Sequence, residues 1–208
     1  LALAHILCTL FKNHGNGTLN VLLFMEIACL RRGDEKMIEL RNITGDNIDD
    51  VITLEVGEKQ KEFVLETTNL RCSADAHMLN ADGIPATPLA IYADETIVGF
   101  LMYIYDTMDH ESFKNEVFYG KKSYFIWHNM IDKSYQGKGY GKLAFEKMLM
   151  DIETMPYGEA EYVNLFYHTS NVIAKRLYDS FGFVDTGIIQ NNSMLAIKNL
   201  DGKITELL

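Results

Sequence analysis

The chain carries the stretch Tyr135-Gln136-Gly137-Lys138-Gly139-Tyr140-Gly141-Lys142 between a β-rich run at 124–131 and an amphipathic helix. One apolar face identifies the helix, formed by Phe145, Met148, Leu149 and Ile152. Glycine at such a junction lets backbone N–H groups approach an anion closely, and the helix N-terminus adds the positive end of its dipole. The stretch therefore predicts a strand–loop–helix unit that binds a ligand carrying phosphate.

Three phosphate-binding motifs compete for these glycines. A Walker loop needs Ser or Thr after its Gly-Lys pair, but Leu143 follows Lys142. A dinucleotide fingerprint would need a third glycine in place of Lys142 and an opening βαβ unit, which the chain lacks. The pattern Q/R-x-x-G-x-G/A, which holds the pyrophosphate of coenzyme A, is matched without a gap by Gln136, Gly139 and Gly141. Glycine-rich surface turns are common, so this match is weak until other parts of the chain support it.

The rest of the chain alternates strands and helices. We expect strands at 37–41, 88–92, 97–103, 124–131 and 162–167, a closing hairpin of 183–188 and 194–200, helices after Asp46, at 59–70 and at 172–181, and a polar loop at 106–120. Gly182 stands where a helix C-cap favours glycine. The pattern predicts one α/β domain, a mixed sheet with helices packed on it.

The composition excludes several classes of protein. Hydrophobic residues make up 48% and charged residues 23%, as in ordinary globular proteins. The net charge of −10 disfavours a nucleic acid or an anionic membrane as partner. Cys8, Cys29 and Cys72 form no metal-ligand or disulfide pattern. They predict reduced thiols, a cytoplasmic location and no metal site.

Residues 1–36 differ from the rest. Two apolar runs, at 1–11 and 19–30, are each too short for a membrane span, and the features of a signal peptide are missing. They could be short elements docked on the core, or a stretch that is not native to the functional protein. We therefore treat 1–36 as an extension of uncertain origin and 37–208 as the domain.

A second motif supports the coenzyme A assignment. Thr169-Ser170-Asn171 precedes a helix that ends Arg176-Leu177-Tyr178-Asp179-Ser180-Phe181-Gly182-Phe183. Together with the glycine loop, this element resembles the GNAT acetyltransferase superfamily. The runs 88–92, 98–100 and 127–142 are similar to the bacterial diamine and spermine/spermidine N-acetyltransferases. The resemblance covers about 37–200 and implies the GNAT fold, a mostly antiparallel mixed sheet flanked by helices.

The resemblance also implies a function and its residues. Acetyl-CoA would be the cosubstrate, and a small primary amine, above all a polyamine or diamine, would be the acceptor in a ternary complex. Homodimers are common in the family and are expected here. The cofactor would be held by backbone groups of Met130 and Ile131 at the pantetheine arm, by Gln136, Gly137, Lys138, Gly139, Tyr140 and Gly141 at the pyrophosphate, and by Asn171 and Tyr178 near the reactive end.

Tyr178 is the candidate general acid. A phenol with an ordinary pKa near 10 is a plausible proton donor to a departing thiolate. Tyrosine on an amphipathic helix is more often core packing, and the match to the family element is what favours catalysis.

Three residues are candidates for binding the amine. His128 stands where a basic residue such as arginine would be expected, and strand alternation directs it away from Trp127. Glu55 and Glu58 could attract a polycation, with Glu62 and Glu66 beside them. A structural histidine and acidic residues that face only water are the simpler interpretations. The acceptor could therefore be another amine, such as an aminoglycoside-like drug or a protein N-terminus, or the chain could bind acyl-CoA without catalysis.

A chain that begins at Met37 should fold and acetylate the same amines as the full chain, because the regular pattern and the resemblance both begin there. Gel filtration and an acetyl-transfer assay check this. Aggregation of the shortened chain would show that the apolar runs belong to the core.

Overall fold

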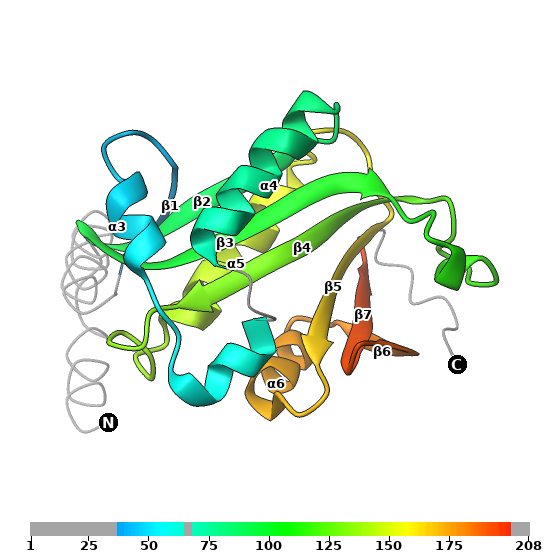
Figure 1. The fold of residues 1–208 in the computed structure, drawn as a ribbon. Helices are drawn as coiled ribbons and strands as arrows, with labels where there is room; N and C mark the ends of the chain where they lie inside the picture. Colours follow the sequence, from blue (N-terminus) through cyan, green and yellow to red (C-terminus); the bar gives the residue numbers. More distant parts are fainter. Residues whose placement is uncertain (1–36, 65–67, 201–208) are drawn as a thin grey trace, which may run out of the picture. The chain divides into compact units, whose positions relative to one another are not determined.

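The computed structural model describes residues 37–64 and 68–200. The expectations for 1–36, for Glu66 and for the end of the domain at 201–208 lie outside the described residues. Within them, seven strands form one sheet in the order β1-β2-β3-β4-β5-β7-β6 (Figure 1). The strands are β1 (Ile38–Asn42), β2 (Ala86–Ala93), β3 (Thr96–Thr107), β4 (Lys122–Ile131), β5 (Tyr162–His168), β6 (Val184–Gln190) and β7 (Ser193–Asn199). Neighbours are antiparallel except β4 and β5, which run parallel. The predicted mixed, mostly antiparallel sheet is confirmed.

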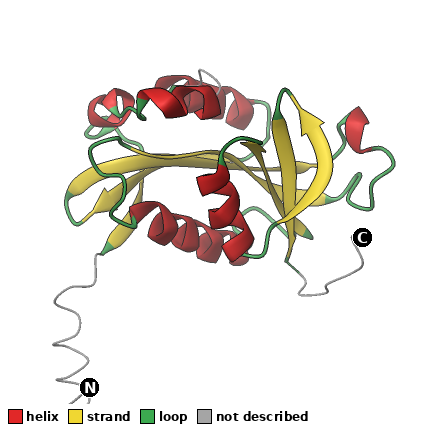
Figure 2. Cartoon of the chain, turned by 90° about the horizontal axis from the view of Figure 1, so that it is seen from below, coloured by secondary structure: helices red, strands yellow, loops and turns green. Residues whose placement is uncertain are grey.

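Helices cover both faces of this sheet (Figure 2). Helices α3 (Ile48–Thr53) and α4 (Asn69–Ala81) pack on one face, and α5 (Tyr140–Glu153) and α6 (Val172–Ser180) pack on the other. Successive strand residues point to opposite faces, so neighbours on β3 enter different cores. Leu101 lies with Phe145 of α5, whereas Phe100 lies with Cys72 of α4. Cys72 is a buried free thiol.

The helix predicted at 59–70 is wrong. Residues Glu58–Val64 form a 3₁₀ helix, and α4 begins only at Asn69. The Thr68 hydroxyl accepts a hydrogen bond from the Arg71 N–H at 3.1 Å and so caps the new helix. The sequence of α4 mixes polar and apolar residues on all sides, which is why its hydrophobic pattern did not reveal it.

Strand β4 contains a bulge at Trp127. In the pairing with β3, Tyr103 lies opposite Ile126 and Met102 lies opposite His128, which leaves Trp127 without a partner. An extra residue of this kind bends a strand and shifts its side-chain alternation by one position. Ile126 accordingly faces the α5 core, whereas Met130, four residues later, faces the α4 core.

Beyond the bulge, β4 and β5 separate. Their parallel pairing extends only from Ser123 opposite Tyr162 to Ile126 opposite Leu165. Strand β4 then continues to Ile131 and β5 to His168 without further pairing between them. The sheet therefore opens into a wedge at this end (Figure 1).

Gly99 is required where β3 meets β4 near this opening. A Cβ atom at Gly99 would lie 2.4 Å from the Met130 carbonyl oxygen, a backbone atom that cannot move aside easily. Gly99→Ala should therefore lower the free energy of unfolding by about 1–3 kcal/mol, as overpacking does. Gly45→Ala is the matched control, because nothing lies within 4 Å of a Cβ there. Chemical denaturation measures both, and equal stability of the two variants would contradict the close packing.

Candidate active site

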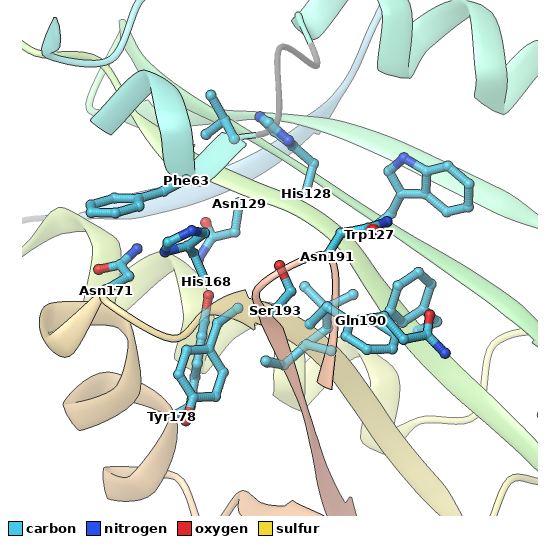
Figure 3. A pocket seen from close by; sticks show the side chains of 16 residues that line it. Phe63, Trp127, His128, Asn129, His168, Asn171, Tyr178, Gln190, Asn191 and Ser193 are labelled. Atoms are coloured by element: carbon cyan, nitrogen blue, oxygen red, sulfur yellow. The ribbon is translucent and has the colours of Figure 1, made fainter. Parts of the chain in front are cut away.

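A cavity of about 370 Å³ lies where β4 and β5 separate, and Figure 3 shows the side chains around it. It is lined by residues 125–129 of β4, 165–168 of β5, 63–64 of the 3₁₀ helix, Asn171 and Tyr178 at α6, and Gln190, Asn191 and Ser193 of the closing hairpin. We call it the β4–β5 cavity. None of these lining residues is Asp, Glu, Lys or Arg.

The bulge decides which β4 side chains reach the cavity. Strict alternation predicted that Trp127 and His128 would face opposite sides, but both line this cavity. A bulge brings two successive side chains toward one side of the strand, which accounts for the difference. Trp127 is 37% exposed and packs edge to face against Phe125, with ring centroids 5.8 Å apart.

His128 is buried, and its ring lies 5.7 Å from that of Phe100. Burial lowers the pKa of the imidazole to about 4, because the charged form loses its hydration. The ring is therefore neutral near pH 7, with one nitrogen that can accept a hydrogen bond.

Asn129 provides an unsatisfied acceptor. Its Oδ1 is buried and has no hydrogen-bond partner among the described residues. Leaving a buried polar atom unpaired costs about 1–3 kcal/mol, so such an atom calls for an explanation. The residue lines the β4–β5 cavity, close to His128 and His168 (Figure 3). A bound molecule that offers an N–H group would satisfy it.

Tyr178 lies across the cavity from β4, on the side of α6 (Figure 3). Its ring is held by three aromatic neighbours, with centroids 5.2 Å from Phe145, 5.9 Å from Tyr167 and 6.0 Å from Phe183. Burial raises the pKa of the Tyr178 phenol to about 12. The hydroxyl therefore stays protonated at every pH at which the protein would work.

Asn171 and His168 flank the start of α6. The Asn171 Oδ1 accepts a hydrogen bond from the Ala174 N–H at 3.1 Å, which caps the helix and leaves the side-chain NH₂ directed elsewhere. His168 Nδ1 lies 2.8 Å from Ser170 Oγ and 3.3 Å from the Ser170 backbone nitrogen, so Ser170 holds the ring in place. Both Asn171 and His168 line the cavity.

The glycine loop has the backbone that an anion site needs. Gly137 and Gly139 have φ angles of +73° and +85°, and open space lies where a Cβ would be at each. Gly139 is the N-cap of α5, and no side chain caps that helix. The first N–H groups of α5 are thus available for a phosphate, as the motif predicts. Lys138 lies in this loop with its Nζ 5.0 Å from the centre of the Tyr135 ring, and Tyr140 and Gly141 begin the helix.

Gln136 anchors the loop. Its Nε2 donates to the Ile131 carbonyl and to Gln60 Oε1, each at 2.8 Å. These bonds tie the loop to the end of β4 and to the 3₁₀ helix. The role of Gln136 in the structure is thus to position the loop, and direct contact of its side chain with a pyrophosphate stays a prediction.

The backbone at the end of β4 modifies one prediction. The Asp132 N–H donates to the Val98 carbonyl on β3 at 2.9 Å. Alternate strand residues direct their backbone groups to the same neighbour, so Met130 also faces β3, whereas Asn129 and Ile131 face the opening. Of the predicted pair Met130 and Ile131, only Ile131 has backbone groups on the open side, and its carbonyl oxygen also accepts Gln136 Nε2. Contact of Met130 or Ile131 with the pantetheine arm stays a prediction.

Glu55 and Glu58 lie outside the cavity lining. Glu55 forms an ion pair with Lys133 at 2.6 Å, and the hydrogen bond from that ammonium lowers the pKa of the carboxyl. Glu58 pairs with Lys61 at 2.7 Å. Both carboxylates are exposed, so any attraction they exert on an amine acts through solvent and is screened by salt. Their role in binding the acceptor stays a prediction.

Two further features concern metals and membranes. Within residues 37–64 and 68–200, no group of three or more His, Cys, Asp or Glu side chains could hold a metal ion. No helix of that same part combines the length and the apolar character needed to cross a membrane.

The fold is shared with solved structures of acetyltransferases. The spermidine N-acetyltransferase of Vibrio cholerae in complex with CoA and spermine superposes with a TM-score of 0.57 at 13% identity, over 79% of this chain and 96% of that chain. The aminoglycoside N(6')acetyltransferase of Legionella pneumophila gives 0.55 at 18% identity, over 82% and 96%.

Sequence comparison identifies the family. Residues 53–183 match the model of the acetyltransferase (GNAT) family, and the chain belongs to this family. The probable spermine N(1)-acetyltransferase of Bacillus subtilis subsp. natto (strain BEST195) is 28% identical over 165 residues, which cover 78% of this chain and 99% of the relative. The spermine/spermidine N(1)-acetyltransferase of Bacillus subtilis (strain 168) is 27% identical over the same shares.

The sequence did not single out several residues of the site. Asn129 had one available signal, a polar residue within an otherwise apolar strand end. The sequence contained no such signal for Phe125 and Phe166, because an aromatic residue in a strand usually indicates core packing. It contained none for Gln190 either. Only the tertiary fold brings the closing hairpin to β4.

Gly139→Ala should weaken the binding of coenzyme A about tenfold or more, which corresponds to about 1.4 kcal/mol, because the methyl group enters the space beside the α5 N–H groups. Gly83→Ala is the matched control. Gly83 has a φ of +81° and the same open surroundings, so the conformational strain is similar while the loop stays intact. Calorimetric titration with coenzyme A measures the difference. Equal affinity of both variants for coenzyme A would show that the glycine loop does not bind the cofactor.

Proposed function

We propose that this acetyltransferase transfers the acetyl group of acetyl-CoA to a primary amine of a polyamine or diamine, directly within a ternary complex. The observation that carries the proposal is the similarity to two spermine acetyltransferases over 99% of their length. The β4–β5 cavity supports it, because neutral donors and acceptors meet there, and the uncapped N-terminus of α5 supports it separately as a site for phosphate.

The chain offers groups that fit coenzyme A at two places. The N–H groups at the start of α5 suit the pyrophosphate. The open edge of β4 at Asn129 and Ile131 suits the amide groups of the pantetheine arm, and the unpaired Asn129 Oδ1 could accept one of their N–H groups. When bound, acetyl-CoA supplies an activated thioester, so no protein nucleophile is needed.

The cavity favours the form of the amine that reacts. Only the neutral amine has a lone pair, and a cavity without carboxylates in its described lining disfavours the ammonium form by desolvation. His128 is neutral and can accept one N–H of the amine, which directs the lone pair. With a pKa of about 4 it is too weak a base to keep the proton, so the proton passes on to water.

Tyr178 supplies a proton to the sulfur that leaves. Its phenol is protonated because burial raises the pKa to about 12, and the same burial raises the basicity of a thiolate beside it. The three packed rings hold the hydroxyl in one place. Positioning of this kind is the main contribution that the chain makes to catalysis.

Release of free thiol from acetyl-CoA, measured across a panel of amines, tests the proposal. Spermine, spermidine and short diamines should be acetylated with a higher kcat/KM than an aminoglycoside or a peptide N-terminus. A preference for either of the latter two would assign a different acceptor to the same fold. Loss of acetyl-CoA binding altogether would contradict the cofactor assignment.

Tyr178→Phe should lower kcat about 10²-fold with little change in the affinity for coenzyme A, because the lost proton donor acts only as the thiolate leaves. The ratio of the wild-type kcat to the kcat of Tyr178→Phe should stay constant between about pH 6 and 9, since the hydroxyl does not ionise in this range with a pKa of about 12. Tyr167→Phe is the control. Its hydroxyl donates to Asp185 at 2.8 Å, so that variant should lose stability and keep kcat. If Tyr178→Phe has the same kcat as the wild type, Tyr178 contributes only to packing and is not the proton donor.

A further inference from the structure

A second cavity adjoins the β4–β5 cavity. It has a volume of about 190 Å³ and lies where the end of β3 meets the start of β4, β5 and the end of β6. We call it the side cavity. Its polar lining consists of Asp106, Thr107, His110, Ser123, Asn164 and Gln190.

The two cavities share a wall of three residues. Phe125, Phe166 and Gln190 line both of them. Phe125 packs edge to face against Phe166 at 6.2 Å and against Trp127 at 5.8 Å, so an aromatic row leads from one cavity to the other. Such a row can pack against methylene groups and can face a cation with its rings.

The side cavity is rich in acceptors. Asp106 uses Oδ1 to accept the Thr107 N–H at 2.7 Å, and no ion pair involves this carboxylate in the described part of the chain. Asn164 is buried, and its Nδ2 donates to Ser123 Oγ at 2.9 Å, which leaves its carbonyl oxygen for another donor. The described lining contains no Lys or Arg.

The charged groups around Asp106 leave room for a cation. Lys122 precedes Ser123 on β4, but its ammonium lies 5.2 Å from the centre of the Tyr105 ring and does not line the cavity. His110 does line it, with Nδ1 accepting the Ser112 N–H at 3.2 Å. The negative charge of Asp106 is therefore without a counter-ion in its own cavity.

We propose that the side cavity binds the distal ammonium group of a long polyamine at Asp106, while the near end of the polyamine reacts in the β4–β5 cavity. This inference rests on the proposed function and assigns to it a residue that selects substrate length. The β4–β5 cavity supplies the neutral surroundings that the reacting nitrogen needs. The side cavity supplies the negative charge that a protonated distal nitrogen needs.

Strand geometry gives the length of the substrate. Asp106 lies opposite Ser123 in the sheet and Met102 lies opposite His128, so four residue steps of β3 separate the two ends of the substrate site. Four steps of a strand span about 13 Å. An extended chain advances about 1.2 Å per bond, so 13 Å corresponds to about 11 bonds, which the roughly 13 bonds between the terminal nitrogens of spermine can bridge. A short diamine spans less than half of this distance and cannot use both cavities.

Asp106→Asn tests the inference, because it removes the charge and keeps an oxygen for the Thr107 N–H. The variant should have a KM and a calorimetric Kd for spermine, both with saturating coenzyme A, about tenfold higher than the wild type. Its KM and Kd for 1,4-diaminobutane should equal those of the wild type. The difference between variant and wild type in the Kd for spermine should shrink as the salt concentration increases. Asp109→Asn is the matched control, since it removes one charge three residues along the chain, at an exposed position outside both cavities. This control variant should have the same KM and Kd for both amines as the wild type.

Two outcomes would overturn the inference, and they are distinguishable. If wild type acetylates polyamines but Asp106→Asn and Asp109→Asn give the same KM and Kd for spermine, the proposed function stands and the side cavity has no part in it. If wild type binds and acetylates no polyamine, the proposed function fails and the inference fails with it. A thermal melt of each variant establishes that the comparison is made between folded proteins.

Discussion

The end of the pairing between β4 and β5 is the constraint on which the site depends. Four residue pairs hold the two strands together, from Ser123 to Ile126 on β4, and then the strands separate. The bulge at Trp127 lies at this point and bends β4 away. Separation creates the cavity, and the shift in alternation turns Trp127, His128 and Asn129 into its lining. It also leaves backbone groups of β4 free to pair with a ligand in place of a strand.

Burial then shifts the pKa values of two polar side chains that line the β4–β5 cavity. Burial lowers the pKa of His128 and raises that of Tyr178, and the opposite directions have one cause. Low polarity disfavours whichever form is charged, which is the protonated form of an imidazole and the deprotonated form of a phenol. Both residues are therefore neutral, one as an acceptor and one as a donor. Neither state requires a neighbouring charge.

The sequence predicted the parts of this site that local chemistry determines. Glycine at positions 137 and 139 is needed for positive φ, and the Asn171 cap with the Tyr178 element starts and fills α6. Tertiary contacts were not predictable in this way. Glu55 pairs with Lys133, which is distant in sequence, and its role in binding a cation stays a prediction. The bulge at Trp127 changed the expected direction of one side chain.

The position of negative charge connects the acidic chain with its proposed chemistry. A carboxylate beside the reacting nitrogen would stabilise the ammonium form, and an opposite charge at close range shifts a pKa by about 1–3 units. Each unit of pKa increase would lower the fraction of neutral amine about tenfold, and the rate would fall with it. A cationic substrate still needs a negative partner if it is to be distinguished from neutral amines. Charge at the far end of the substrate meets both requirements, because attraction there is independent of the protonation state of the nitrogen that reacts. Among the described residues, the lining of the β4–β5 cavity contains no carboxylate and Asp106 of the side cavity forms no ion pair, which is the distribution of charge that both requirements favour.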